Sequence, residues 1–352
     1  MSYGRGLKFQ PPVFSEMGKI YTNCAIRVEN RIWFVTYVYN SLQIFDTESR
    51  LLEEIGEIPI GSRYDTDVVD QMVYDNGKII FIPKRKGKLI FYDFEEKAFV
   101  NNGLEIEDSI VCKKEHILYG LKFGYKYYKY NFPNNKTEEI VCISDMLNSY
   151  GVDHKTLIKS IVFNEYICVL PRYPKMSNKY ILYNTNTDTA EWVTIPEIKK
   201  CWEIESYNDG LIAVSFDESY CVKFKPHDDK YDKYNTSNSG WSQLLCSMDR
   251  VYINYIHAKS LYYIDESGIH EEESFSKYRS TDNKMFATPD DVFLLPTYTN
   301  MEFYSYRCGI LPVAFSKRDV IYDMKLYGKG IYNEISNIYS LKDYIDEISN
   351  KT

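Results

Sequence analysis

The chain repeats one pattern of turn, apolar strand and aromatic–acid pair seven times along most of its 352 residues. Three of the copies carry a proline at the end of the apolar run, in "IIFIP", "ICVLP" and "VFLLP". We call this position of each copy the anchor, and the seven anchors are Thr36, Pro83, Gly120, Pro171, Ser215, Asn254 and Pro296. Their mean spacing of about 43 residues predicts one structural unit stacked beside its own copies.

Each copy predicts four strands. The residues just before the anchor are apolar on both faces, as in a strand covered on both sides. Turn formers such as Asn76-Gly77 stand about six residues earlier and predict a tight hairpin turn. An aromatic residue followed by Asp or Asn, such as Tyr92-Asp93, predicts the end of a third strand, and stretches such as "TAEWVTIPE" predict a fourth. The prolines then stand where a second strand ends, so no ladder hydrogen bond is lost.

These repeats resemble the blades of a seven-bladed β-propeller. The architecture is similar to that of propellers built from kelch, WD40 and NHL-type repeats. The resemblance implies an all-β fold of four-stranded antiparallel blades over residues 21–318. The sequence has neither the Gly-His and Trp-Asp pairs of WD40 repeats nor the double glycine of kelch repeats. No function of a named class therefore transfers. In general appearance the chain, with its 34 tyrosines, is similar to tyrosine-rich bacterial propellers.

Two segments fall outside the repeat. Residues 1–20 contain "FQPPVFSE", which predicts an extended stretch that could add a strand and close the ring. Residues 319–352 contain "SLKDYIDEISN", where Leu341, Tyr344, Ile345 and Ile348 follow the spacing of an amphipathic helix. This helix is expected either to dock on its own propeller or to contact a partner.

The composition limits the classes of partner and the cellular compartment that we expect for this protein. A net charge of −8 argues against a general affinity for nucleic acid or for anionic membranes. No run of about 18 apolar residues occurs, so we expect no membrane span, and the N-terminus lacks the apolar run of a signal peptide. The eight cysteines are scattered without a CxxC pair. They predict buried free thiols in a reducing cytoplasm rather than disulfides.

Catalytic signatures are missing from the sequence. It contains no GxSxG elbow, no HExxH, no glycine-rich phosphate loop and no EF-hand loop. We therefore expect no cofactor and no metal. The acidic stretches "PHDDKYDKY" and "IHEEES" are expected to be hydrated surface turns on the rim away from the ligand-binding loops.

Ligands of propellers usually bind where the loops between the second and third strands meet the connections between blades. We refer to these as the b–c loops and the d–a connections, after strands a to d of a blade. The candidate binding residues at this channel-side loop face are Tyr39, Arg63, Tyr64, Arg85, Arg172, Tyr173, Trp202, Trp241, His257 and Tyr298. Aromatic rings mixed with cationic donors could stack on sugars, hold an anionic group or grip a peptide.

Three functions stay open on the sequence. The first is a non-enzymatic binding scaffold that recognises a protein, a peptide or a glycan with this face. The second is an enzyme of the hydrolase or lyase type acting on a carbohydrate or a small polar substrate, with carboxylates such as Asp65 and Asp67, or His154 with His257, as acid and base. The third is a structural subunit that assembles through its C-terminal helix.

Overall fold

The computed structural model describes residues 22–36, 40–49, 52–61, 65, 67–255, 261–273, 284–295 and 302–312. The predictions for residues 1–20 and 319–352, and for Pro296, lie outside this part of the chain. By its internal contacts the chain divides into two compact units. The larger unit is Val69–Val292, and the smaller one comprises Met1–Val68 with Phe293–Thr352.

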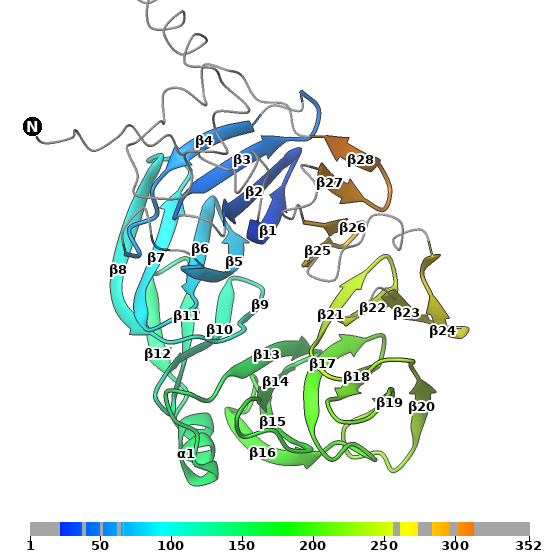
Figure 1. Ribbon diagram of the computed structural model, residues 1–352. Coiled ribbons are helices and arrows are strands. Elements are labelled where there is room, and N and C mark those ends of the chain that lie inside the picture. The colour runs from blue at the N-terminus through cyan, green and yellow to red at the C-terminus, as the bar shows by residue number, and fades with distance from the viewer. Residues whose placement is uncertain are drawn as a thin grey trace, which may run out of the picture. The chain divides into compact units, whose positions relative to one another are not determined.

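The described strands form seven four-stranded antiparallel sheets, so the predicted seven-bladed β-propeller fold is confirmed (Figure 1). The blades of the larger unit are blade 2, β5–β8 (Val69–Asp75, Lys78–Pro83, Gly87–Asp93, Ala98–Ile106); blade 3, β9–β12 (Cys112–Lys114, Ile117–Phe123, Lys126–Asn131, Lys136–Glu139); blade 4, β13–β16 (Ile158–Phe163, Tyr166–Pro171, Lys179–Asn184, Thr189–Thr194); blade 5, β17–β20 (Cys201–Tyr207, Gly210–Ser215, Tyr220–Phe224, Tyr231–Asn235); and blade 6, β21–β24 (Ser242–Ser247, Arg250–Tyr255, Leu261–Asp265, Gly268–Glu271). The other two are blade 1, β1–β4 (Thr22–Val28, Arg31–Thr36, Leu42–Asp46, Leu52–Gly56), and blade 7, β25–β28 (Met285–Thr288, Asp291–Leu294, Glu302–Ser305, Gly309–Pro312).

The anchors stand at or near the ends of the second strands. Pro83 is the last residue of β6 and pairs with Val69, and Pro171 is the last residue of β14 and pairs with Ile158. A proline at that place removes no donor from the interior of the ladder. Gly120 differs, because β10 continues to Phe123 after a register shift between Tyr119 and Leu121.

The aromatic–acid pair has a structural cause. The backbone N–H groups of Glu95 and Glu96 donate to Asp93 Oδ1 at 3.0 and 3.2 Å, so the carboxylate holds the turn that follows β7. Asp46, Asn184 and Asp265 make the same kind of turn. The register slips in blade 7, where β27 ends at Ser305 rather than at the predicted Tyr306-Arg307.

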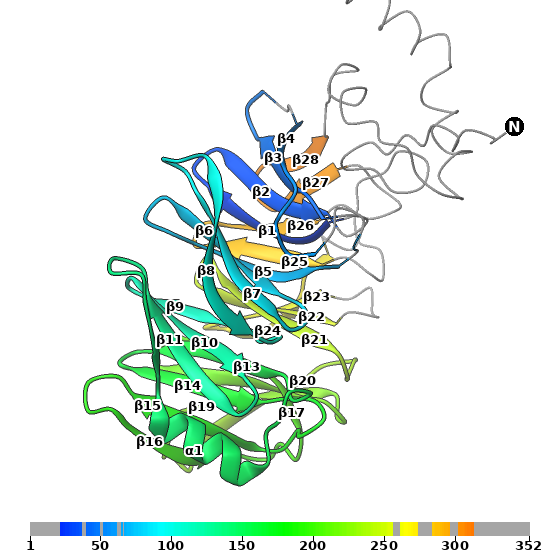
Figure 2. The ribbon, with the colours of Figure 1, turned by 90° about the vertical axis from the view of Figure 1, so that its left-hand side faces the viewer.

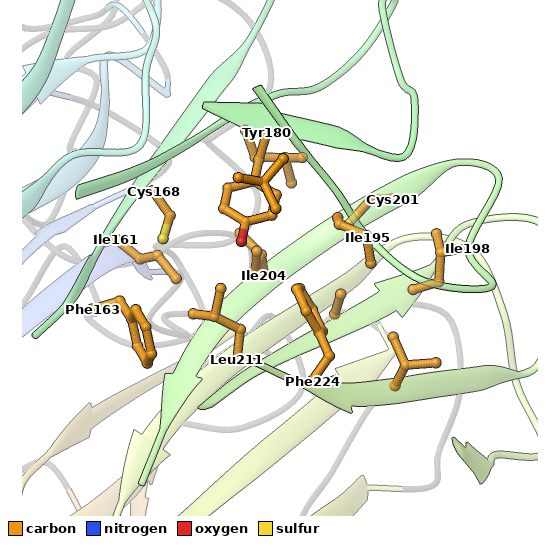
Figure 3. Packing of buried hydrophobic residues seen from close by; sticks show 14 of the residues in the cluster. Ile161, Phe163, Cys168, Tyr180, Ile195, Ile198, Cys201, Ile204, Leu211 and Phe224 are labelled. Carbon is orange, nitrogen blue, oxygen red and sulfur yellow. The ribbon is translucent and has the colours of Figure 1, made fainter. Parts of the chain in front are cut away.

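The cores lie between neighbouring sheets. Between blades 4 and 5, Ile161, Cys168 and Tyr180 pack against Ile204, Leu211 and Phe224 (Figure 3). Trp33 is buried in β2, as its apolar column predicted. All eight cysteines are free thiols, and four of them are buried.

One helix was not predicted. The sequence pattern predicted strands and turns alone for the blades, but α1 spans Val141–Tyr150 between the strands β12 and β13. Its buried side chains, Ile143, Ser144 and Leu147, recur at helical spacing, and Gly151 ends the helix in a left-handed conformation. The helix lies beside β15 and β16 (Figure 2). The ring centroids of Tyr150 and Trp192 are 5.0 Å apart there. Trp192 of β16 is therefore a packing residue beneath the helix.

Candidate binding site

The b–c loops and the d–a connections meet at one end of the sheets of the larger unit. The Arg172 N–H donates to Leu157 O at 2.7 Å, and the Cys201 N–H donates to Ser177 O at 2.8 Å. The a–b and c–d turns meet at the other end, as where the Phe94 N–H donates to Gly77 O at 2.8 Å. We call the first end the b–c loop face.

Arg172 is held on this face by a ring and a carboxylate. Its guanidinium carbon lies 3.8 Å from the centroid of the Trp202 ring, and its Nη2 lies 2.9 Å from Glu203 Oε1. Trp202 is fixed in turn, because its Nε1 donates to Ser242 O at 2.9 Å. Arg172 and Trp202 are each only 3% exposed. Arg172 and Trp202 therefore form a buried base that supports the exposed residues of the face from below and offers almost no surface of its own to a ligand.

Two exposed rings lie above this base. Trp241 meets Trp202 edge-on at 4.3 Å between centroids, and Tyr173 lies 6.4 Å from Trp241. Phe216 contacts both tryptophans, at 5.6 and 5.9 Å. Tyr173 is 55% exposed and Trp241 43%, although large rings of this kind usually bury most of their area. We call Tyr173, Trp202, Phe216 and Trp241 the aromatic cluster.

A buried ion network supports Arg172 from below. Lys159 of β13 pairs with Glu203 and lies 3.5 Å from Glu205 Oε2, so one carboxylate, Glu203, serves both Lys159 and Arg172. Burial lowers the pKa of the Lys159 ammonium, but Glu203 and Glu205 outweigh burial and the pKa is raised overall. Burial also raises the pKa of Glu205. The network links the first strands of blades 4 and 5.

A second group of charges lies on the same face at blades 2 and 3. Asp108, in the connection between β8 and β9, has its pKa raised to about 7 by burial and by the neighbouring Asp70 carboxylate. Lys84, Lys122 and Arg172 act in the opposite direction but do not outweigh these causes. Asp108 Oδ1 is buried, and no donor of the described residues reaches it. Asp108 is thus poised to exchange a proton near neutral pH.

Lys122 acts on Asp108 from β10, is fully buried, and has two hydrogen-bond partners. Its Nζ lies 3.0 Å from Glu107 Oε2 and donates to Asp153 O at 3.0 Å. Glu107 Oε2 also accepts the Gly124 N–H at 2.9 Å. The positive charge of Lys122 is therefore matched by Glu107 and not by Asp108.

The structure brings four of the ten predicted residues together: Arg172, Tyr173, Trp202 and Trp241. Arg85 is exposed in the turn after β6 and stands apart from these contacts. Tyr39, Arg63, Tyr64, His257 and Tyr298 lie outside the described residues. Of the acid–base candidates, Asp65, Asp67 and His154 are described, and His154 is exposed.

Sequence reasoning missed Asp70, Asp108, Lys159 and Glu203. The usable signal was a charged residue inside an otherwise apolar first strand, as in "IKSIVF" for Lys159 and "CWEIESY" for Glu203. A charge in such a strand needs a partner, because a buried unpaired charge is costly. Asp108 had no comparable signal, since "EIEDSI" is an ordinary acidic connection.

The described residues give no metal site and no membrane helix. No three His, Cys, Asp or Glu side chains among them gather closely enough to hold a metal ion. In the same part of the chain, no helix has the length and apolar character to cross a bilayer. The cytoplasmic location stays a prediction.

No protein-family profile and no curated protein matches the sequence. Solved propellers are similar in fold. Virginiamycin B lyase from Staphylococcus aureus, in a catalytically inactive form with Quinupristin, matches with a TM-score of 0.61 and 9% identity over 83% of this chain and 97% of that chain. YCF48 bound to D1 peptide gives a TM-score of 0.56 and 7% identity over 85% and 97%. PorZ of Porphyromonas gingivalis gives 0.55 and 10% over 83% and 37%. Such identities show a shared fold alone.

Proposed function

We propose that this propeller is a binding module whose b–c loop face recognises a protein, a peptide or a glycan. The observation that carries the proposal is the exposed pair Tyr173 and Trp241 on a rigid, buried base. Exposed aromatic rings in contact with one another mark interaction surfaces more often than isolated ones do. Trp, Tyr and Arg are also the residues that dominate binding energy at interfaces.

A polypeptide partner is favoured over a glycan. The charges under the aromatic cluster are paired internally, Arg172 with Glu203 and Lys159 with Glu205. Arg172 and Trp202 are also covered, so the cluster offers a ligand chiefly the exposed rings of Tyr173 and Trp241 rather than polar groups for the many hydroxyls of a sugar. Among the similar propellers, YCF48 was solved with a bound peptide.

The test compares wild type with the double variant Tyr173→Ala/Trp241→Ala, using a random peptide display library and a glycan array. Each aromatic anchor is worth about 1–2 kcal/mol, so the double variant is expected to bind selected ligands about 30-fold to 1000-fold more weakly. Tyr231→Ala removes an exposed tyrosine from the outer strand β20 and serves as the control. Equal binding by the double variant, with an unchanged melting temperature, would refute the proposal.

A second candidate function is an enzyme of the hydrolase or lyase type acting on a carbohydrate or a small polar substrate. Asp108 favours it, because a carboxyl with a pKa of about 7 can take up and release a proton at neutral pH. Its test is a substrate screen with wild type and Asp108→Asn. Turnover that disappears in the variant would support an enzyme, whereas turnover that persists would exclude Asp108 as its acid or base.

A further inference from the structure

The two loops that carry the exposed rings contain no carboxylate. Tyr173 lies in the b–c loop of blade 4, residues 172–178, which read "RYPKMSN". Trp241 ends the connection from blade 5 to blade 6, residues 236–241, which read "TSNSGW". Lys175 of the first loop is exposed, and the second loop has no charged residue. A ligand that covers the two rings therefore meets positive charge from these loops and no negative charge.

A third segment brings a second exposed lysine beside Tyr173. The Leu157 N–H donates to Tyr173 O at 3.0 Å, so the connection from α1 to β13 runs along the b–c loop of blade 4. Lys155 in this connection is exposed. The ammonium of Lys175 lies over the start of the same connection, since a Cβ added to Gly151 would be 3.5 Å from its Nζ. We call Lys155 and Lys175 the lysine pair.

The lysine pair has no counter-ion in the part of the chain that the structure describes. The acid closest in sequence, Asp153, is turned to the backbone of its own connection. Its Oδ1 accepts the Lys155 and Thr156 N–H groups at 2.9 and 3.1 Å. On the blade 5 side of the aromatic cluster, Asp217 pairs with Lys200 at 3.0 Å. These two carboxylates are thus engaged, whereas the two ammonium groups of the lysine pair are exposed and available.

We propose that the aromatic cluster takes an acidic segment of a partner polypeptide, with an apolar or aromatic side chain on Tyr173 and Trp241 and an Asp or Glu at the lysine pair. This inference rests on the proposed function and adds the chemistry of the partner. Charge complementarity supports it, because exposed and unpaired positive charge borders the exposed rings. Rings and ammonium groups both lie at the surface, so a partner can reach them without any movement of the protein.

The net charge of −8 does not oppose an acidic partner at this place. At an ionic strength of about 0.15 M, exposed charges more than about 8 Å apart are largely screened from each other. The charges beside the rings therefore decide the local attraction. The same net charge does disfavour a nucleic acid, because its affinity comes from many phosphate contacts spread over a large surface. A short acidic segment needs only the lysine pair.

The first experiment tests the charge preference with synthetic probes. The full-length protein, labelled for NMR, is titrated with three capped peptides that share a central tryptophan and carry glutamate, glutamine or lysine on both sides of it. We expect the glutamate peptide to shift the Trp241 indole N–H and the Lys155 and Lys175 amide resonances at the lowest concentration, and the lysine peptide at the highest. Salt raised from about 20 mM to about 500 mM should weaken the glutamate peptide and leave the glutamine peptide unchanged. Equal effects of the three peptides, no effect of any, or a preference for the lysine peptide would overturn the proposal.

The second experiment separates the lysine pair from the rings. Peptides selected from the display library are measured against Lys155→Gln/Lys175→Gln and against the control Lys97→Gln/Lys230→Gln, which removes two exposed lysines from c–d turns at the opposite end of the sheets. Exposed ion pairs are individually weak, so we expect the first variant to bind the peptides about threefold to thirtyfold more weakly and the control less than about twofold more weakly.

The outcomes distinguish this inference from the proposed function. If the selected peptides need Tyr173 and Trp241 but carry no acidic residue and bind the lysine variant as well as wild type, the acidic segment is wrong and the binding module stands. If only glycans bind, both the polypeptide partner and the acidic segment are wrong. Displacement of the peptides by a short single-stranded oligothymidylate at equal concentration would overturn the acidic segment in favour of a nucleic acid.

Discussion

Gln71 and Gln243 make the same two-bond contact in two different blades. The Gln71 amide donates from Nε2 to Val111 O at 2.9 Å and accepts the Val111 N–H on Oε1 at 2.8 Å. Gln243 does the same to Met285, at 2.9 and 3.3 Å. In each case a first strand is tied to the chain that enters the next blade. The backbones of neighbouring blades are not hydrogen-bonded into one sheet. The glutamine side-chain amide therefore supplies the partners that this backbone N–H and C=O need.

Removing this contact is expected to destabilise the larger unit. Gln71→Ala leaves the Val111 N–H and C=O without their partner, so the free energy of unfolding should fall by about 1–3 kcal/mol in a urea titration. Gln71→Glu can still accept from the N–H but cannot donate to the carbonyl, and it should fall between the alanine variant and wild type. An alanine variant as stable as wild type would show that water replaces the glutamine at no cost.

The buried network around Glu203 predicts a rescue by charge balance. Glu203→Gln leaves Lys159 with Glu205 alone and removes the carboxylate that Arg172 pairs with, and should cost about 3–5 kcal/mol. Adding Lys159→Met removes one of the two cations, and the double variant should recover part of that loss in the same unfolding assay. If the losses of the two single variants simply add, the charges are not coupled and the network is incidental.

The repeat was predictable because it rests on local chemistry. Turn residues such as Asn76-Gly77 and strand-ending acids such as Asp93 act within a few residues of themselves, so the sequence shows them directly. The helix α1 was missed because its apolar face, with Ile143 and Leu147, is short and stands in a connection where a loop is the ordinary expectation. The end of β27 was misplaced for a similar reason. In blade 7 the Ser305 hydroxyl accepts the Cys308 N–H at the position where Asp or Asn holds the turn in other blades, and a serine is not a distinctive sequence marker of that position.

The site was predictable only in part, because the sequence of one repeat does not show which residues of another blade will contact it. Arg172, Tyr173, Trp202 and Trp241 were grouped by their loops, but their burial was not foreseen: Arg172 and Trp202 are covered, whereas Tyr173 and Trp241 are exposed. The pairing of Lys159 with Glu203 joins strands 44 residues apart in the chain. The interaction of Asp70 with Asp108 likewise depends on how neighbouring sheets stack.

Gly120 is expected to tolerate no side chain. Its φ is +108°, and a Cβ there would lie 2.7 Å from Ser160 Oγ and 3.1 Å from the Val111 Cα. Ser160 Oγ also forms a 2.8 Å hydrogen bond with the Tyr127 hydroxyl, so it has little freedom to move. Gly120→Ala should lower the melting temperature strongly. Gly124→Ala is the matched control, with φ of +63° and open space around it, and should cost only about 1 kcal/mol. Similar losses at both positions would show that strain, and not the close contact, matters.

Asp70→Asn tests which cause raises the pKa of Asp108. Burial is the larger cause and the repulsion by Asp70 the second. Without the Asp70 charge, the pKa of Asp108 should fall below 7 but remain well above its ordinary value of 3.8, as followed by carboxyl ¹³C NMR. A return to 3.8 would show that the carboxyl pair, and not burial, dominates. No change would mean that the two carboxyls do not interact.

Asp108→Asn is expected to stabilise the protein at high pH and not at low pH. The folded protein holds the proton of Asp108 up to about pH 7, whereas the unfolded chain releases it near pH 4, so wild type loses stability as the pH rises between these values. With about 1.4 kcal/mol per pKa unit, and allowing for partial exposure of the side chain, the variant should gain about 2–4 kcal/mol relative to wild type between pH 4 and pH 8. Asp46→Asn is the contrasting control: backbone hydrogen bonds lower the pKa of Asp46 below 3.8, so its stability difference from wild type should be constant between pH 4 and pH 8 and should shrink only below about pH 4. A stability difference for Asp108→Asn that does not vary with pH would show that the pKa of this carboxyl is the same in the folded and the unfolded protein.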